Sequence, residues 1–117
     1  MSLFPDVAPA RAGLLTITAL AREDGAGMCL RLAGDADLSE CDALEQALAV
    51  PVAADGDVHL DLAALTFADV AVARLLASTA ARLVPGRKLV LHRASPALQR
   101  LVQMCWPDQP GLEVSDA

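Results

Sequence analysis

The sequence predicts a single α/β domain, in which a mixed sheet of four to five strands carries about three helices. Two patterns lead to this prediction. Stretches that alternate apolar and polar residues, typical of half-buried strands, are followed by stretches with apolar residues three or four apart, typical of helices. Their order is β-β-α-β-α-β-α-β, and strands that alternate with helices imply parallel pairing. A chain of 117 residues can bury one hydrophobic core.

The N-terminal part of the chain predicts an arm and a hairpin. Residues 1–13 contain two prolines and little periodicity, so we expect a flexible arm before a domain that spans 14–117. Residues 15–19 and 28–32 both alternate and predict two strands. The Asp and Gly residues within 23–27 are typical of the turn between them.

The first predicted helix follows the second strand. Ser39 with Asp42 three residues later resembles a capping box and indicates where the helix begins. Apolar residues then recur at helical spacing as far as Leu48. We expect Pro51 to end the helix, because proline lacks an amide hydrogen and its ring clashes with the preceding turn.

The second helix is predicted after a strand at 58–62 and a loop at 63–69. Asp69 suits the N-cap position, because its carboxylate can accept a hydrogen bond from the first free amides of the helix. Pro85 and Gly86 predict its end. Helical spacing gives this helix a buried stripe of Val72, Leu75, Leu76, Thr79 and Leu83.

The C-terminal part predicts one more strand, a third helix and an edge strand. The short apolar run at 89–91 is typical of a strand covered on both faces. Ser95 and Pro96 suit the N-cap and first position of a helix, whose buried stripe is expected to reach Cys105. Residues 112–114 predict the final strand.

Composition and charge exclude several classes of function. The net charge is −6 and no Lys/Arg cluster is present, so direct nucleic-acid binding is disfavoured and a partner with a basic face is favoured. No apolar run approaches the roughly 20 residues of a membrane helix, and no secretory signal is recognised, so we expect no membrane insertion. The three cysteines match no metal spacing and indicate reduced thiols in the cytoplasm.

No catalytic, metal or cofactor motif is found. The sequence lacks Gly-x-Ser-x-Gly, a phosphate-binding glycine loop and His-x-x-x-His. His59 and His92 lie on predicted strands without a neighbouring set of ligands, and we interpret them as surface or boundary histidines. We therefore expect no enzymatic activity. A small enzyme, the least favoured alternative, would need a deep polar pocket around a group with a shifted pKa.

Four segments, in this order and spacing, resemble the signature of STAS domains, the family of bacterial anti-sigma-factor antagonists. These segments are 30–38, 60–69, 86–91 and 95–101, within a similarity that spans roughly residues 14–115. In that family a serine kinase modifies the second serine of an Asp-Ser-Ser-Gly run. Here Asp69 is followed by Val70, Ala71 and Val72. The substitution makes the start of the helix more apolar, which favours a persistent protein contact there.

The resemblance implies a partner-binding face around this loop and helix. Its expected residues are Asp37, Thr66, Asp69, Val70, Ala71, Arg74 and Ser78. Ala71 occupies the acceptor position, and without a hydroxyl it cannot be phosphorylated. Asp69 serves as an N-cap and in addition could contact the partner, whereas Asp37 is either a solvated turn residue or a contact. Thr66 and Ser78 are the alternative phosphoacceptors.

The resemblance also implies a function. We expect the domain to bind an anti-sigma factor of the serine-kinase type, or another regulatory protein, and to be continuously competent without its usual switch. The alternative is a STAS-like scaffold subunit of a lipid-transport ATPase complex or of a stress-sensing assembly. The sequence leaves open whether the domain forms a homodimer.

Overall fold

The computed structural model describes residues 15–21 and 28–115. Its elements are β1 (Leu15–Ala21), β2 (Met28–Ala36), a 3₁₀ turn η3 (Leu38–Glu40), α1 (Cys41–Ala53), β3 (Val58–Ala68), α2 (Val70–Arg82), β4 (Leu89–His92), α3 (Pro96–Cys105) and β5 (Leu112–Ser115). This order confirms the predicted α/β fold. The predicted arm at 1–13 and the predicted turn at 23–27 lie outside the described residues.

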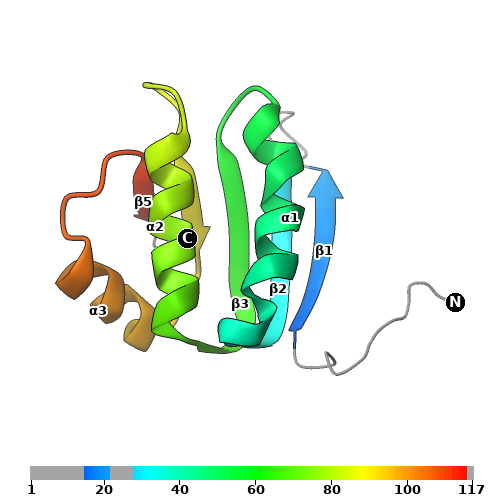
Figure 1. Cartoon of the computed structure of the whole chain (residues 1–117), viewed down its shortest axis with the longest axis vertical. Coiled ribbons are helices and arrows are strands. Elements are labelled where there is room, and N and C mark those ends of the chain that lie inside the picture. Colours follow the sequence, from blue (N-terminus) through cyan, green and yellow to red (C-terminus); the bar gives the residue numbers. More distant parts are fainter. Residues whose placement is uncertain (1–14, 22–27, 116–117) are drawn as a thin grey trace, which may run out of the picture.

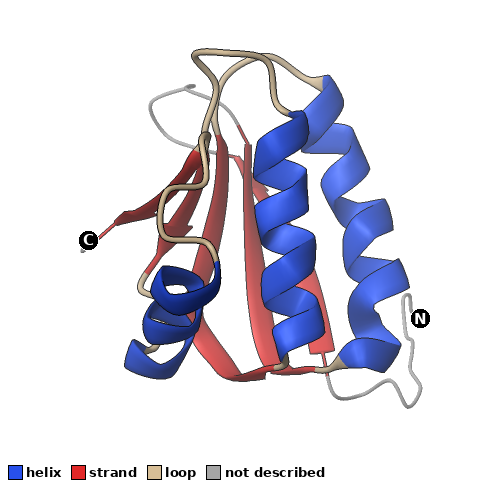
Figure 2. Ribbon diagram, turned by 60° about the vertical axis from the view of Figure 1, so that its left-hand side comes forward, coloured by secondary structure: helices blue, strands red, loops and turns tan. Residues whose placement is uncertain are grey.

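The sheet holds its strands in chain order, β1-β2-β3-β4-β5. β1 is antiparallel to β2, and each later pair of neighbours is parallel. Figures 1 and 2 show α1, α2 and α3 on the same face of the sheet. Among the described residues, no helix lies on the opposite face.

One hydrophobic core lies between the helices and the sheet. Leu60 on β3 is opposite Leu30 on β2 and Leu91 on β4, which aligns apolar residues across the parallel strands. Leu44 on α1 and Leu76 on α2 belong to the same cluster and are fully buried. Burying such a leucine stabilises the fold by roughly 1.5–3 kcal/mol. The apolar residues that repeat along the strands and helices are the ones that pack in this core.

The loop predicted at 63–69 is wrong, because β3 continues to Ala68. Its second half pairs with β2, where Gly34 is opposite Leu65 and Asp35 is opposite Phe67. Two register irregularities accompany this extension. Pairing with β2 keeps these residues extended beyond the end of the neighbouring β4, so only Asp69 separates β3 from α2.

The ends of α1 also differ from the prediction. Asp37 caps the turn η3 that leads into the helix, in place of Ser39. Pro51 lies inside the last turn and the helix ends at Ala53. The guanidinium of Arg87 stabilises this end of the helix. It donates to the carbonyl oxygens of Pro51 at 3.0 Å, Val52 at 2.7 Å and Gly56 at 2.7 Å. These bonds satisfy carbonyls that a helix C-terminus leaves unpaired.

The buried faces of α2 and α3 follow the predicted stripes with two differences. Val72, Leu76 and Thr79 are fully buried, and Leu75 and Leu83 are partly buried against the same core, as predicted; α2 also buries the small residues Ala73, Ala77 and Ala80. On α3 the prediction for Cys105 is wrong: its side chain is exposed at the last position of the helix. The caps at Asp69 and Ser95 are confirmed.

Candidate functional site

The C-terminal ends of β2 and β3 lie side by side and place two capping aspartates next to each other. The amide of Asp69 donates to the carbonyl oxygen of Ala36 at 2.9 Å, so Asp37 and Asp69 begin their turns from adjacent strands. The Asp37 carboxylate accepts from the amide of Ser39 at 2.9 Å and from its hydroxyl at 2.5 Å. Asp37 is therefore a capping residue, which the sequence did not indicate.

The start of α2 presents one of its three apolar residues to solvent. Val70 is 46% exposed, Ala71 is partly buried, and Val72 is fully buried in the core. The expectation that all three make this surface more apolar is therefore wrong for Val72, whose side chain packs inside. The amide of Ala71 donates to the Asp69 carboxylate at 3.2 Å. A carboxylate thus already occupies the helix terminus that would stabilise a phosphate there.

The two alternative phosphoacceptors both have hydroxyls that donate to backbone carbonyls. Thr66, exposed on β3, donates to the carbonyl oxygen of Gly34 at 3.0 Å and also bonds the Asp35 carboxylate. Ser78, exposed on α2, donates to the carbonyl oxygen of Leu75 at 3.0 Å. A phosphate on Thr66 would lie against the Asp35 carboxylate, and this like-charge contact opposes modification at that position.

Three large exposed apolar side chains lie close to the two capping aspartates along the sequence. Leu38 is 69% exposed, Phe67 is 53% exposed, and Val70 is exposed to a similar degree. Each lies within two residues of Asp37 or Asp69 along the chain. We call these three residues the docking patch. Exposed apolar clusters rimmed by polar residues are typical of protein-interaction sites.

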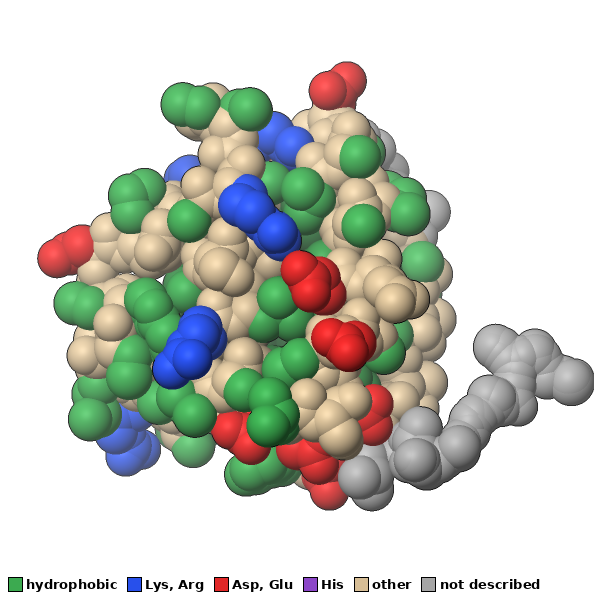
Figure 3. Space-filling model, in the orientation of Figure 1, with side chains coloured by type: hydrophobic (Ala, Val, Ile, Leu, Met, Phe, Trp, Pro, Cys, Tyr) green, Lys and Arg blue, Asp and Glu red, His purple; other side chains and the backbone are tan. Residues whose placement is uncertain are grey.

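The surroundings of the docking patch are acidic. Burial raises the pKa of the Cys41 thiol, and nearby carboxylates raise this pKa further; they belong to Asp69, Asp42, Asp37 and Glu45. Figure 3 shows acidic side chains gathered around the lower ends of α1 and α2, with hydrophobic side chains between them. The site therefore combines apolar contact surface with an acidic rim.

The exposed side of α2 extends this surface along the helix. Val70, Arg74 and Ser78 recur every four residues and are all exposed, so they form one stripe that leads away from the docking patch. None of the ion pairs recorded between described residues involves Arg74. The stripe brings together the predicted residues 70, 74 and 78, whereas Ala71 faces partly inward.

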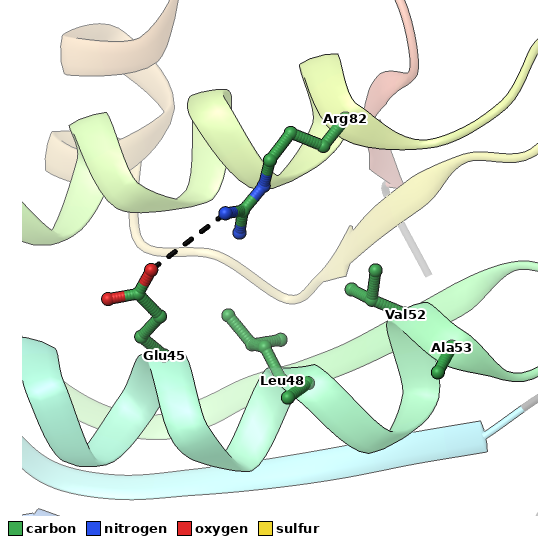
Figure 4. Close-up of a pocket in the computed structure, with 6 residues that line it drawn as sticks. Glu45, Leu48, Val52, Ala53 and Arg82 are labelled. Atoms are coloured by element: carbon green, nitrogen blue, oxygen red, sulfur yellow. Dashed lines mark ion pairs between the residues drawn. The ribbon is translucent and has the colours of Figure 1, made fainter.

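A shallow depression of about 350 Å³ lies between α1 and α2. Figure 4 shows Leu48, Val52 and Ala53 of α1 along its side, with Glu45 and Arg82 facing each other across it. The Arg82 Nη1 atom is 3.8 Å from the Glu45 Oε2 atom, and both side chains are about half exposed. The depression has the lining of a helix–helix groove and lacks a set of converging polar groups, so we do not assign chemistry to it.

Across 15–21 and 28–115, no three His, Cys, Asp or Glu side chains are grouped as metal binding requires. Within the same residues, no helix combines the length and apolar character needed to cross a membrane.

The sequence interpretation missed a polar cluster on the helix-free face of the sheet. His59 is 9% exposed, and its Nδ1 atom is 2.8 Å from Nε2 of His92 on the next strand. Asp61 is 7% exposed and bonds Arg31 and Arg93. The sequence held one indication of this cluster, the predicted parallel pairing of the strands. Pairing 58–62 with 89–92 brings the two histidines onto one face of the sheet.

The fold and site define a small α/β domain with exposed apolar residues and acidic side chains near the start of α2. Comparison with known proteins gives its family. The family model described as "Mlab, STAS domain" matches residues 19–109, so the chain belongs to the STAS domain family. No match to this chain was found among curated proteins.

Three solved structures are similar to this chain. An anti-sigma factor antagonist from Mycobacterium paratuberculosis is 26% identical, with a TM-score of 0.62 over 84% of this chain and 86% of that chain. SpoIIAA in its unphosphorylated form is 17% identical, with a TM-score of 0.65 over 87% and 88%. An antisigma-factor antagonist STAS domain from Rhodobacter sphaeroides is 18% identical, with a TM-score of 0.57 over 72% and 95%.

Proposed function

We propose that this protein is a non-catalytic anti-sigma-factor antagonist that binds an anti-sigma factor through the docking patch and the exposed stripe of α2. The observation that carries the proposal is the exposure of Leu38, Phe67 and Val70, three large apolar residues that flank the capping aspartates Asp37 and Asp69 in the sequence. The likeness in fold to anti-sigma factor antagonists supports it, and one of these is 26% identical in sequence.

The proposed binding has no phosphorylation switch at position 71. Ala71 has no hydroxyl, and its amide already donates to the Asp69 carboxylate. Partner binding would therefore be continuous and controlled by the amount of either protein. Incubation with ATP and a cognate kinase should leave residue 71 unmodified, whereas a phosphate mapped to Thr66 or Ser78 would place the switch elsewhere.

The chemistry of the face defines the complementary surface of the partner. An apolar patch is best covered by an apolar pocket, and the carboxylates of Asp37 and Asp69 favour basic residues around that pocket. Because surface charges steer association, binding should weaken as the salt concentration rises.

The direct test measures, by isothermal titration calorimetry, the affinity for an anti-sigma factor of the serine-kinase type from the same host. Val70→Lys inserts a charge into the docking patch and should weaken binding by about tenfold or more, equivalent to roughly 1.4 kcal/mol. Arg74→Glu tests the stripe of α2. Arg100→Glu, at an exposed site on α3, is the matched control and should keep the affinity. Equal affinity in all three variants would show that the docking patch and the stripe of α2 do not bind the anti-sigma factor.

The second candidate function is that of a scaffold subunit, held permanently in a lipid-transport ATPase complex or a stress-sensing assembly. The absence of a hydroxyl at Ala71 favours it as well, because a permanent contact needs no switch. Purification of the tagged protein from its host separates the two roles. An ATPase or sensor protein that copurifies in fixed stoichiometry, and is lost in Val70→Lys, favours the scaffold.

A further inference from the structure

A row of polar residues crosses the helix-free face of the sheet. Backbone pairing places Arg31 of β2, Asp61 of β3 and His92 of β4 side by side. Thr18 on β1 and Ser115 on β5 continue the row at its two edges. Since leucines flank Asp61 on the core side of β3, this row points away from the helices.

Asp61 is the centre of this row and holds two guanidinium groups. Its Oδ2 atom is 2.6 Å from Nη2 of Arg93 and 3.4 Å from Nε of Arg31, while its Oδ1 atom accepts from the amide of Ala63 at 3.1 Å. The Asp61 side chain is 10% exposed, but those of Arg31 and Arg93 are 52% and 55% exposed. The carboxylate is thus covered by the two cations, which face solvent.

Both guanidiniums retain capacity for a ligand. A guanidinium carries five N–H donors, and the hydrogen bonds between described residues use one donor of Arg31 and one of Arg93. Two positive charges on one carboxylate leave a local charge of +1 in a chain whose net charge is −6. Planar guanidiniums match carboxylate and phosphate groups in bidentate geometry.

The backbone of Arg93 supports a functional position. Its φ is 58°, and no other non-glycine residue in the described part of the chain has a positive φ. A residue with a side chain adopts this conformation at a cost, and such residues concentrate at ligand-binding sites. The conformation lies in the short link between β4 and α3 and accompanies the contact of the guanidinium with Asp61.

Two histidines, His59 and His92, lie next to Asp61 on the same face of the sheet. The bond between His59 and His92 requires that one ring donate and the other accept. Their rings are stacked with centroids 5.0 Å apart. This contact joins β3 to β4 beside Asp61, on the strand that leads to Arg93.

We propose that Arg31 and Arg93, held by Asp61, form a binding site for an oxyanion, the phosphate or carboxylate group of a small molecule. The site lies on the face of the sheet opposite the helices, away from the exposed stripe of α2. It does not depend on the proposed anti-sigma function, and a ligand there could be bound while α2 contacts a protein partner.

The test is an NMR titration of the full chain with sodium phosphate and, separately, with sodium acetate, at constant ionic strength maintained with NaCl. Saturable shifts should appear at the amides of 61–63 and 92–94 and at the side-chain Nε–H of Arg31 and Arg93. The anion with the lower dissociation constant identifies the preferred group. Shifts that do not saturate with either anion would overturn the proposal.

Variants distinguish the site from general attraction of anions. Arg93→Gln and Arg31→Gln should each weaken the preferred anion by at least about fivefold, since each removes one guanidinium. Arg100→Gln removes an exposed arginine on α3 and should leave the affinity within twofold of wild type. Equal weakening in all three would show that only the net charge matters.

Arg93→Gly tests the meaning of the unusual backbone. Glycine adopts a positive φ readily, so this variant relieves the strain while it removes the guanidinium. We expect a folded protein, with wild-type amide shifts outside 61–63 and 92–94, that no longer saturates with phosphate or acetate. A variant that binds as tightly as wild type would overturn the role of Arg93.

Discussion

The carboxylate of Asp69 accepts a hydrogen bond from the backbone amide of Ala71 at 3.2 Å, so these two residues close the start of α2. At position 71, which the family resemblance assigns as the acceptor, the side chain has no hydroxyl and the amide is already bonded. Both features oppose control by phosphate at this helix terminus. Under the proposed function, the apolar and acidic surface around it makes a continuous contact with the partner.

Ala71 separates the effect of a hydroxyl from the effect of a charge. Ala71→Ser should bind the anti-sigma factor within about twofold of wild type, while Ala71→Asp should bind at least about tenfold more weakly, or roughly 1.4 kcal/mol, because a third carboxylate joins Asp37 and Asp69. Calorimetry measures both affinities. Ala81→Asp, at the exposed far end of α2, is the control for added charge. Similar losses in the two aspartate variants would contradict this reasoning.

Asp69 should stabilise the domain as an N-cap whether or not it contacts a partner. Asp69→Ala removes the acceptor for the Ala71 amide and should lower the free energy of unfolding by about 1 kcal/mol. Asp69→Asn keeps an acceptor oxygen and should cost less. Urea denaturation followed by circular dichroism measures the difference. An equal cost for both variants would mean that charge, and not capping, is the source of the stability.

The fold could be predicted because its signals are local. Apolar periodicity located the leucines of the core, such as Leu44 and Leu60, and capping chemistry identified Asp69 and Ser95. The errors depend on contacts between segments distant in the sequence. Pairing with β2 extends β3 to Ala68, and the Arg87 guanidinium satisfies carbonyls at the end of α1. Neither contact leaves a periodic signal in its own segment.

The candidate site was predictable only in part, for the same reason. The resemblance indicated the start of α2, but it could not show that Val72 is buried while Val70 is exposed. Asp37 also acts as a cap of η3, which composition does not indicate. The polar row on the other face requires the register of β2, β3 and β4, and strand register cannot be read from each strand alone.

The cysteines should differ in their reactivity. The pKa of the Cys41 thiol is raised by burial and by the carboxylates of Asp69 and Asp42, so less of it is thiolate at neutral pH. Since the thiolate is the nucleophile, Cys41 should react slowly with iodoacetamide, whereas exposed Cys105 should react faster. Peptide mass spectrometry after timed labelling gives both rates. If Cys41 is labelled as fast as Cys105, the acidic environment of the site has been assigned incorrectly.

Asp61 should make the stability of the domain depend on pH in acid. The hydrogen bond from Arg93 is the main cause that lowers the pKa of its carboxyl group, with further contributions from the Ala63 amide and Arg31. A lowered pKa in the folded state adds stability above the unfolded value of about 3.9, and this stability is lost as the pH falls through the folded pKa. Wild type should therefore lose stability below about pH 4 through this group.

Asp61→Asn tests this dependence, because asparagine keeps the shape and loses the charge. At pH 7 the free energy of unfolding of the variant should be lower by about 1–2 kcal/mol. This is near the low end of the range for hydrogen bonds to charged groups, because the side chains of both arginines are half exposed. The difference should shrink between pH 4 and pH 2.5, as measured by urea denaturation. Asp55→Asn, at an exposed position before β3, is the control. A difference that stays constant over this range would show that Asp61 acts through its shape and hydrogen bonds, without its charge.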